Sequence, residues 1–269
     1  MSVADGQPLF LIIAKASRLC NIPTIVFQHG LLLNGIDEAS EMDYILSYSE
    51  ETKRNYIRIG NSDKKIKIVG NTQYDSFIKM NRKNTKKIIY AMEISSGIRS
   101  LTPETLLGKK RQKINLRRIF RVMKKFPDYQ LIIKIRPKWD MKNLPSKIAK
   151  EEGFKNFEVI EKSEEGNLIN NCDVFLINWT TMGLAALFLN KPVISVTFKE
   201  YDKINPYKKM GIVEMTYTER QLEKAIKKCI DQKKIDHQEK ETSLNNFILT
   251  DKNSSQRAAN FINKILKRN

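Results

Sequence analysis

Three polar side chains and a glycine occupy the short turn between a predicted strand and a predicted helix. They are Asn178, Thr180, Thr181 and Gly183, and the apolar run 174–177 before them is typical of a strand buried on both faces. Hydroxyls at the start of a helix can cap it, and the free N–H groups and dipole of that helix attract phosphate. The turn therefore predicts an anion site, and the alternative is a capped helix without a ligand.

A histidine stands at a second strand end. His29 and Gly30 follow the predicted strand 24–28, and parallel sheets place ligands at the carboxyl ends of their strands. The unperturbed pKa of histidine suits proton transfer near neutral pH, and the glycine lets the backbone turn sharply beside it. His29 is thus a candidate catalytic base, with a purely structural histidine as the alternative.

A basic turn follows a third strand. Lys134, Arg136 and Lys138 surround Pro137, which stops the predicted strand 130–135. The guanidinium of Arg136 could bind a phosphate through two parallel hydrogen bonds. These cations predict an anion-binding edge, with a solvated basic loop as the alternative.

The elements that carry these residues alternate strands with helices, which predicts parallel sheets covered by helices on both faces. Up to residue 69 the strands are too few for an independent core, and the polar segment 70–86 is interpreted as a hinge. A fuller series then predicts a complete doubly wound domain. The expected strands are 24–28, 44–47, 66–69, 88–91, 130–135, 157–160, 174–177 and 193–197, and the expected helices are 8–20, 50–58, 114–125, 144–152, 168–171, 181–189, 219–230 and 255–266.

Composition limits the classes of function. The chain has 269 residues and a formal charge of +18, so it is long enough for two folded units and attracts anions. No apolar run approaches the roughly 20 residues of a membrane-spanning helix, and three separate cysteines favour a reducing cytoplasm over a disulfide framework. The basic residues are spread along the chain without a nucleic-acid-binding motif. The expected anions are phosphorylated substrates and an anionic membrane surface, with compositional drift as the alternative.

The order of five segments extends this interpretation. From about Ile22 to the C-terminus the chain contains, in this order, IPTIVFQHG, IVGNTQYD, KIRPKWD, NCDVFLINWTTMGLAALFLNKPVISVTF and LTDKNSSQRAANFI. In this order they resemble the GT-B superfamily, and within it the branch of CDP-glycerol glycerophosphotransferase-like and capsular polysaccharide transferases. The resemblance implies an α/β, GT-B-like fold in which residues 1–78 are the C-terminal part of an acceptor-side Rossmann-like domain. It implies that residues 79–269 form a complete Rossmann-like domain for the nucleotide donor.

The resemblance also implies a role for each candidate residue. His29 would take the proton of an acceptor hydroxyl. The donor phosphates and the leaving diphosphate would be held by Lys134, Arg136, Asn178, Thr180, Thr181 and Gly183. Electrostatic stabilisation of this kind needs no metal and no cofactor.

The chain departs from the family pattern at three positions. Arg136 stands where the family usually has histidine, Ala185 where it usually has a glutamate that can bind ribose hydroxyls, and Asn253 near a usual glycine. The loss of the glutamate removes a charged acceptor for two hydroxyls, so the identity of the nucleotide stays open.

The expected function is transfer of a glycosyl or glycerol-phosphate group to a surface polysaccharide, teichoic-acid or lipid-linked acceptor. Expected partners are a nucleotide-sugar or CDP-glycerol donor, that acceptor and, peripherally, the anionic cytoplasmic face of the membrane; nucleic acid is not expected. Two alternatives stay open. One is a UDP-sugar 2-epimerase-like enzyme on the same fold, whose carboxylate-rich constellation is not evident. The other is an inactive binding remnant, which Ala185 and the short first part favour.

Overall fold

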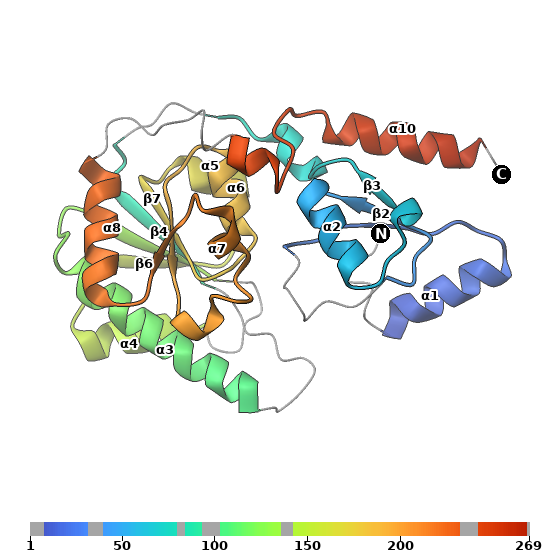
Figure 1. Ribbon diagram of the computed structural model, residues 1–269. Helices are drawn as coiled ribbons and strands as arrows, with labels where there is room; N and C mark the ends of the chain where they lie inside the picture. The colour runs from blue at the N-terminus through green and yellow to red at the C-terminus, as the bar shows by residue number, and fades with distance from the viewer. Residues whose placement is uncertain are drawn as a thin grey trace. The chain divides into compact units, whose positions relative to one another are not determined.

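The chain forms two compact units in a computed structural model (Figure 1). The structure describes residues 8–31, 40–79, 84–92, 103–135, 142–231 and 242–267. The first unit comprises residues 1–77, 203–212 and 236–269, and the second comprises residues 78–202 and 213–235. In the described ranges no helix is long and apolar enough to cross a membrane.

The first unit contains a three-stranded parallel sheet in the order β1-β2-β3. One face packs around Val26, Ile45 and Ile66 with Ala14 of the first helix and Tyr56 of the second. The elements of this unit are α1 (Pro8–Leu19), β1 (Ile25–Phe27), β2 (Tyr44–Ser47), α2 (Glu50–Arg58), η1 (Asp63–Lys65), β3 (Ile66–Ile68), η2 (Thr72–Ser76), α7 (Pro206–Met210) and α10 (Ser254–Leu266). Helix α2 begins with a capping box, because Ser49 and Thr52 satisfy one another's backbone N–H groups.

Helix α10 covers the other face of this first sheet. Ala258 and Phe261 of α10 pack against Leu46 of β2 and Val69 after β3. Helix α10 therefore returns to the first unit. The first unit thus includes residues beyond the expected boundary between residues 78 and 79. The assignment of residues 1–78 to an acceptor side and 79–269 to a donor side stays a prediction.

The second unit contains a six-stranded parallel sheet in the order β6-β5-β4-β7-β8-β9. This is the doubly wound order, because the chain adds strands on one side of β4 and then continues on its other side. The predicted α/β fold with parallel sheets is confirmed. The elements are β4 (Lys87–Ala91), α3 (Pro103–Met123), β5 (Gln130–Lys134), α4 (Leu144–Glu152), β6 (Phe157–Ile160), α5 (Glu165–Asn170), β7 (Val174–Ile177), α6 (Met182–Phe188), β8 (Val193–Val196), η3 (Lys199–Tyr201), β9 (Glu214–Thr216) and α8 (Glu219–Asp231).

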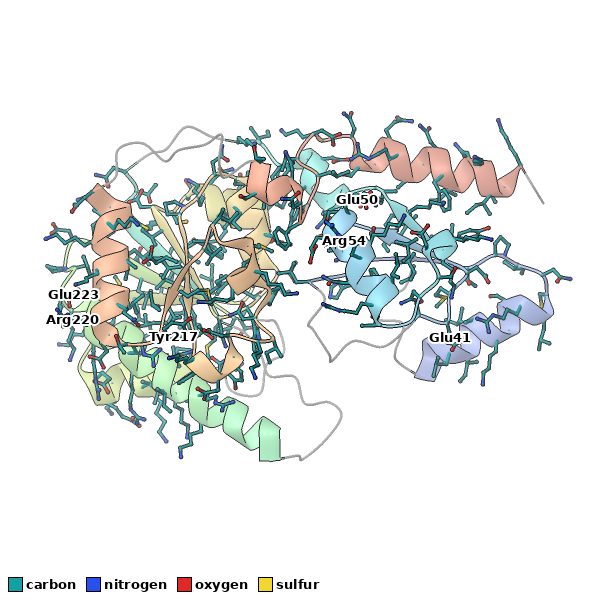
Figure 2. The ribbon with its side chains drawn as sticks, viewed as in Figure 1. Glu41, Glu50, Arg54, Tyr217, Arg220 and Glu223 are labelled. Atoms are coloured by element: carbon teal, nitrogen blue, oxygen red, sulfur yellow. The ribbon has the colours of Figure 1, made fainter. Side chains whose placement is uncertain are left out.

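Strands β7 and β8 are buried along their whole length, as their continuous apolar runs predict. Helices α3 and α8 pack over the sheet through Leu116, Phe120 and Ile226, which belong to one core cluster. On their outer side Glu223 of α8, labelled in Figure 2, pairs at 2.6 Å with Lys125 in the turn after α3. An exposed pair of this kind contributes little stability, so the apolar cluster holds the two helices on the sheet.

Candidate functional site

The carboxyl ends of three neighbouring strands meet at the point where the strand order reverses. Ala91, the last residue of β4, pairs with Lys134 of β5 on one side and with Ile177 of β7 on the other. In doubly wound sheets, ligands bind beside this reversal. The turn after β7 and the end of β5, which the sequence singled out separately, therefore lie along one edge of the sheet.

The turn after β7 presents half-buried threonines next to a buried asparagine. Thr180 and Thr181 are half-buried, whereas Asn178 is 6% exposed. The carbonyl of Asn178 accepts a 2.6 Å hydrogen bond from Ser195 Oγ, which ties the turn to β8. Nothing in the described part of the chain donates to Asn178 Oδ1, although this atom is buried. A buried acceptor without a donor is uncommon, and it gives the turn unused hydrogen-bonding capacity.

The predicted hydroxyl cap of the following helix is wrong. Thr181 precedes α6 with φ −59° and ψ −23°, and its side chain makes no capping hydrogen bond. A capping residue has an extended backbone, so a threonine that is already helical cannot turn its hydroxyl toward the first N–H groups. The N–H groups of Gly183 and Leu184 instead donate to the carbonyls of Thr180 and Thr181. These two N–H groups are therefore not available to an anion at this turn.

Lys134 ends β5, and a carboxylate that the sequence analysis missed, Glu165, begins α5 close to it. The ammonium of Lys134 donates to the carbonyls of Ile135 at 2.8 Å and Glu161 at 3.0 Å. Burial raises the pKa of the Glu165 carboxyl, the ammonium of Lys134 opposes this, and Glu164 adds to it. The signal was the acidic pair at the start of the helix that follows strand 157–160. Arg136 lies outside the described residues.

An aromatic and cationic group flanks the turn. The rings of Trp179 and Tyr201 are 4.6 Å apart, and the guanidinium of Arg111 lies 4.4 Å from the centre of the Tyr201 ring. Arg111 also pairs with Glu200 at 3.0 Å. The ion pair with Glu200 fixes the guanidinium of Arg111 over the Tyr201 ring. This contact keeps the Tyr201 ring against Trp179.

His29 lines a separate cavity within the first unit. The cavity measures about 350 Å³ and lies at the carboxyl ends of β1, β2 and β3, beside α10. The side chain of His29 is exposed, whereas Gln28 is buried and accepts from Tyr48 N while donating to Gly30 O at 2.7 Å. Gln28 thus fixes the backbone that presents His29. The role of His29 as a base stays a prediction.

The GNTQYD segment has a packing role in this unit. Gly70 has φ +89°, and a Cβ atom there would stand 2.3 Å from Ser254 Oγ. Asn71 accepts a hydrogen bond from the N–H of Gln73 and so begins η2 inside the segment that was interpreted as a hinge. The described residues contain no group of three histidine, cysteine or acidic side chains that could hold a metal ion.

A family model described as UDP-N-acetylglucosamine 2-epimerase matches residues 36–263. A search of curated proteins found no significant match. Among solved structures, S. aureus MnaA in a co-structure with UDP has 14% sequence identity and a TM-score of 0.62, over 94% of this chain and 70% of that one. UDP-GlcNAc 2-epimerase from Neisseria meningitidis bound to UDP-GlcNAc has 17% identity and a TM-score of 0.59, over 95% and 72%. UDP-GlcNAc 2-epimerase from Methanocaldococcus jannaschii has 18% identity and a TM-score of 0.56, over 95% and 73%.

These comparisons correct two predictions made from the sequence. The assignment to the CDP-glycerol glycerophosphotransferase and capsular transferase branch is wrong, because the matching family model describes a 2-epimerase. The predicted glycosyl or glycerol-phosphate transfer is wrong for the same reason, and nothing in the comparisons supports a CDP-glycerol donor or a polysaccharide acceptor. The segments quoted for that branch, GNTQYD among them, therefore did not separate it from the 2-epimerase family.

Proposed function

The chain belongs to the UDP-N-acetylglucosamine 2-epimerase family, and from this premise we propose that it binds a UDP-linked N-acetylhexosamine and inverts the sugar at C2. The family match over residues 36–263 carries the proposal. Structures with the same fold are named for their complexes with UDP and UDP-GlcNAc, which supports a nucleotide-sugar as the ligand.

The diphosphate of this ligand is proposed to bind at the edge where the strand order reverses. Asn178, Thr180 and Thr181 would supply hydrogen bonds to it, Gly183 would allow close approach, and Lys134 would contribute positive charge from the end of β5. Support comes from the position of the turn beside β4, at the reversal of the strand order. Each hydrogen bond to a charged group contributes about 1.5–3 kcal/mol.

Inversion at C2 requires that the C2–H bond break and that a proton return on the opposite face of the sugar. Since C2 has no neighbouring carbonyl, the electron pair of that bond would form a C1–C2 double bond while the C1–O bond breaks and UDP leaves. UDP would then add back to C1 as the proton returns to C2. Two protein groups can exchange these protons without a metal or a redox cofactor. Glu165 is our first candidate, because it begins α5 close to Lys134 at the end of β5, and burial raises the pKa of its carboxyl. His29, the candidate base of the sequence analysis, belongs to the first unit, where it lines the cavity at the carboxyl ends of that sheet, and it is tested separately. The sequence analysis predicted that His29 takes the proton of an acceptor hydroxyl, but an epimerase has no acceptor.

Binding without turnover is the competing candidate. Ala185 is fully buried in α6, at the position where the sequence analysis expected a glutamate for the ribose hydroxyls. Without a carboxylate at this position, the ribose hydroxyls lose a charged acceptor and the nucleotide binds less tightly. Weaker binding of this kind is compatible with a protein that has lost catalysis.

One experiment separates these outcomes. The protein is incubated with UDP-N-acetylglucosamine in D₂O, and proton NMR follows the appearance of the C2 epimer and the loss of the H2 signal. Epimer with deuterium at C2 supports the proposal. If calorimetry detects binding but NMR detects no exchange, the protein binds the nucleotide-sugar without turnover. If neither binding nor exchange is observed, both proposals are rejected.

The phosphate turn is tested with a matched pair at one position. Thr181→Val keeps the shape and removes the hydroxyl, whereas Thr181→Ser keeps the hydroxyl. We expect roughly tenfold weaker UDP binding for Thr181→Val and near-normal binding for Thr181→Ser. Equal affinity of the two variants would remove the threonine from the site.

A further inference from the structure

The face of the first sheet that α10 covers holds a lysine where an apolar side chain is expected. Leu46 of β2 pairs in register with Lys67 of β3, and paired residues of parallel strands point to the same face. On that face Leu46 and Val69 pack against Ala258 and Phe261 of α10. Lys67 stands two residues before Val69, on the same face, yet its side chain is exposed. Helix α10 therefore does not close over the sheet at Lys67.

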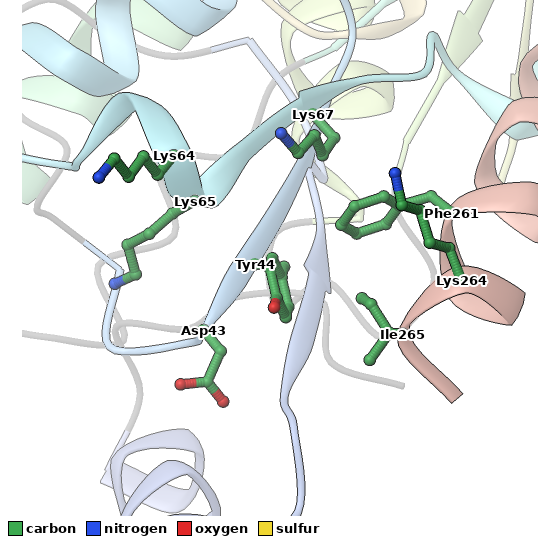
Figure 3. A pocket seen from close by; sticks show the side chains of 8 residues that line it. All are labelled: Asp43, Tyr44, Lys64, Lys65, Lys67, Phe261, Lys264 and Ile265. Carbon is green, nitrogen blue, oxygen red and sulfur yellow. The ribbon is translucent and has the colours of Figure 1, made fainter. Parts of the chain in front are cut away.

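The space left there is an open cavity of about 720 Å³ (Figure 3). Tyr44, Phe261 and Ile265 form its apolar part, and Lys64, Lys67 and Lys264 form its cationic part. Small-molecule sites have volumes of about 300–1,000 Å³. The cavity lies where β2 and β3 begin, so it is at the opposite end of the sheet from the cavity that His29 lines.

The charges around this cavity are unbalanced. Its one acid, Asp43, accepts hydrogen bonds from Thr24 N at 2.8 Å and Thr24 Oγ1 at 2.6 Å, and Lys65 lies beside it. The ammonium of Lys65 donates to Ser40 O at 3.0 Å.

The other three lysines lack such partners. In the part of the chain that the structure describes, the ammonium groups of Lys64, Lys67 and Lys264 have no ion pair or hydrogen bond. A bound anion would relieve the repulsion among these like charges.

Two aromatic rings lie between the lysines. The rings of Tyr44 and Phe261 are 5.3 Å apart and meet edge to face at 78°. Figure 3 shows them between the lysines of η1 and β3 and Lys264 of α10. Both rings belong to half-buried residues, so they can still remove apolar surface of a ligand from water.

We propose that this cavity binds a phosphorylated ligand whose phosphoryl group meets Lys64, Lys67 and Lys264 and whose ring or chain lies against Tyr44 and Phe261. Ammonium groups are strongly hydrated point charges that bind phosphate without the planar geometry that arginine imposes. A nucleoside diphosphate and a phospholipid headgroup share this chemistry. The proposal does not rest on the epimerase activity, because residues of the first unit line the cavity and the edge proposed for the substrate belongs to the second unit.

Lysine footprinting locates such a ligand residue by residue. The protein is acetylated under limiting conditions and analysed by mass spectrometry, alone and with UDP, ADP, inorganic phosphate or vesicles of phosphatidic acid in phosphatidylcholine. A ligand should slow acetylation of Lys64, Lys67 and Lys264 and leave Lys15 unchanged. Lys15 is an exposed lysine of α1, which packs on the other face of the sheet.

The arms distinguish the two sources of the phosphoryl group. Protection by UDP or ADP assigns a soluble nucleotide, and protection by the vesicles alone assigns a lipid headgroup. Protection by inorganic phosphate at the same concentration as the nucleotides would overturn the role of the aromatic rings. No protection with any probe, or equal protection of Lys15, overturns the site.

Charge-matched variants give a second test. Lys67→Met and Lys264→Met keep the aliphatic length and remove one charge, and Lys15→Met removes the same charge elsewhere. The concentration of the effective probe that half-protects Lys64 should rise about tenfold in the first two variants and stay unchanged in the third. Melting temperatures confirm that all three are folded, and equal half-protection in all three overturns the proposal.

Discussion

The carboxylate of Asp75 accepts a 2.6 Å hydrogen bond from the backbone N–H of Ser255, 180 residues later in the chain. It also accepts from the N–H of Ser254 at 3.2 Å, so one side chain satisfies two N–H groups in the first turn of α10. Asp75 belongs to η2, which follows β3 directly. This contact therefore joins the GNTQYD segment to the C-terminal helix and orients α10 along the first sheet.

Replacing Asp75 with asparagine should destabilise the first unit. Asn keeps one acceptor oxygen but loses the negative charge at the positive end of α10, and a lost cap costs about 1 kcal/mol. The melting temperature of the first unit should fall for Asp75→Asn. Asp128→Asn is the control, since Asp128 is exposed and makes no hydrogen bond or ion pair in the described structure. Equal effects of the two substitutions would contradict the capping role.

The contribution of Asp75 should also depend on pH. Burial alone would raise the pKa of Asp75, but hydrogen bonds from Ser255 and Ser254 hold the pKa below its ordinary value. A lowered pKa contributes stability that is fully present above the unfolded pKa of about 3.9 and is lost as pH falls through the folded pKa. The difference in melting temperature between the native protein and Asp75→Asn should thus be constant from pH 7 to 5 and shrink below about pH 4. A difference that persists unchanged into acid would contradict this.

Gly70→Ala should be more damaging than the same change at another left-handed glycine. A Cβ at Gly70 would stand 2.3 Å from Ser254 Oγ, whereas at Gly153, with φ +62°, it would meet nothing within 4 Å. Both substitutions cost about 1 kcal/mol of backbone strain, and only the first adds a steric clash. Denaturant unfolding should show the larger loss for Gly70→Ala, with partial recovery in Gly70→Ala/Ser254→Ala. Equal losses at the two glycines would show that close approach is unimportant.

Local patterns predicted the second sheet well. The apolar runs at 174–177 and 193–197 became β7 and β8, because strands buried on both faces need no polar alternation. Strand β9 was missed, since Glu214–Thr216 has three residues and only Thr216 is buried. Helix α3 begins at Pro103, earlier than the expected residue 114, because the apolar periodicity is clear only in its second half.

The site was less predictable, because some of its contacts join residues far apart in the sequence and because the quoted segments fit more than one family. The contact between Asp75 and Ser255 depends on the fold, which no local pattern encodes. The turn at 178–183 was found because a strand, a polar turn and a helix are adjacent in sequence. Its hydroxyl cap was wrong because the backbone of Thr181 is already helical. The family was misassigned because the segments quoted for it fit the 2-epimerase family as well, and Gly70 in one of them has a packing role.

Cys172 and Cys20 should differ sharply in reactivity. Burial raises the pKa of the Cys172 thiol to about 12, with the ammonium of Lys191 opposing the shift. Cys20 is exposed. Because the thiolate is the reactive form, iodoacetamide at pH 8 should modify Cys20 and leave Cys172 unmodified until the protein is unfolded. Rapid labelling of Cys172 in the folded protein, followed by mass spectrometry, would contradict its burial.

Glu165→Gln tests the proposed proton transfer most directly. Turnover should fall by about 10² to 10⁴, the usual contribution of a positioned acid or base, while UDP affinity changes little. Glu164→Gln is the matched control, because Glu164 caps α5 by accepting from Gly166 N at 3.0 Å and Asn167 N at 2.6 Å. It should lower the melting temperature and leave the activity of the folded fraction intact.

His29→Ala belongs in the same series. If His29 supplies the second proton transfer, its loss should lower turnover to a similar extent without a change in melting temperature. A base with a raised pKa also predicts a native rate that rises with pH through that pKa, and Glu165→Gln should abolish the rise. Full turnover and an unchanged pH profile in a folded Glu165→Gln protein would remove Glu165 from the reaction, and the same result for His29→Ala would make the histidine structural.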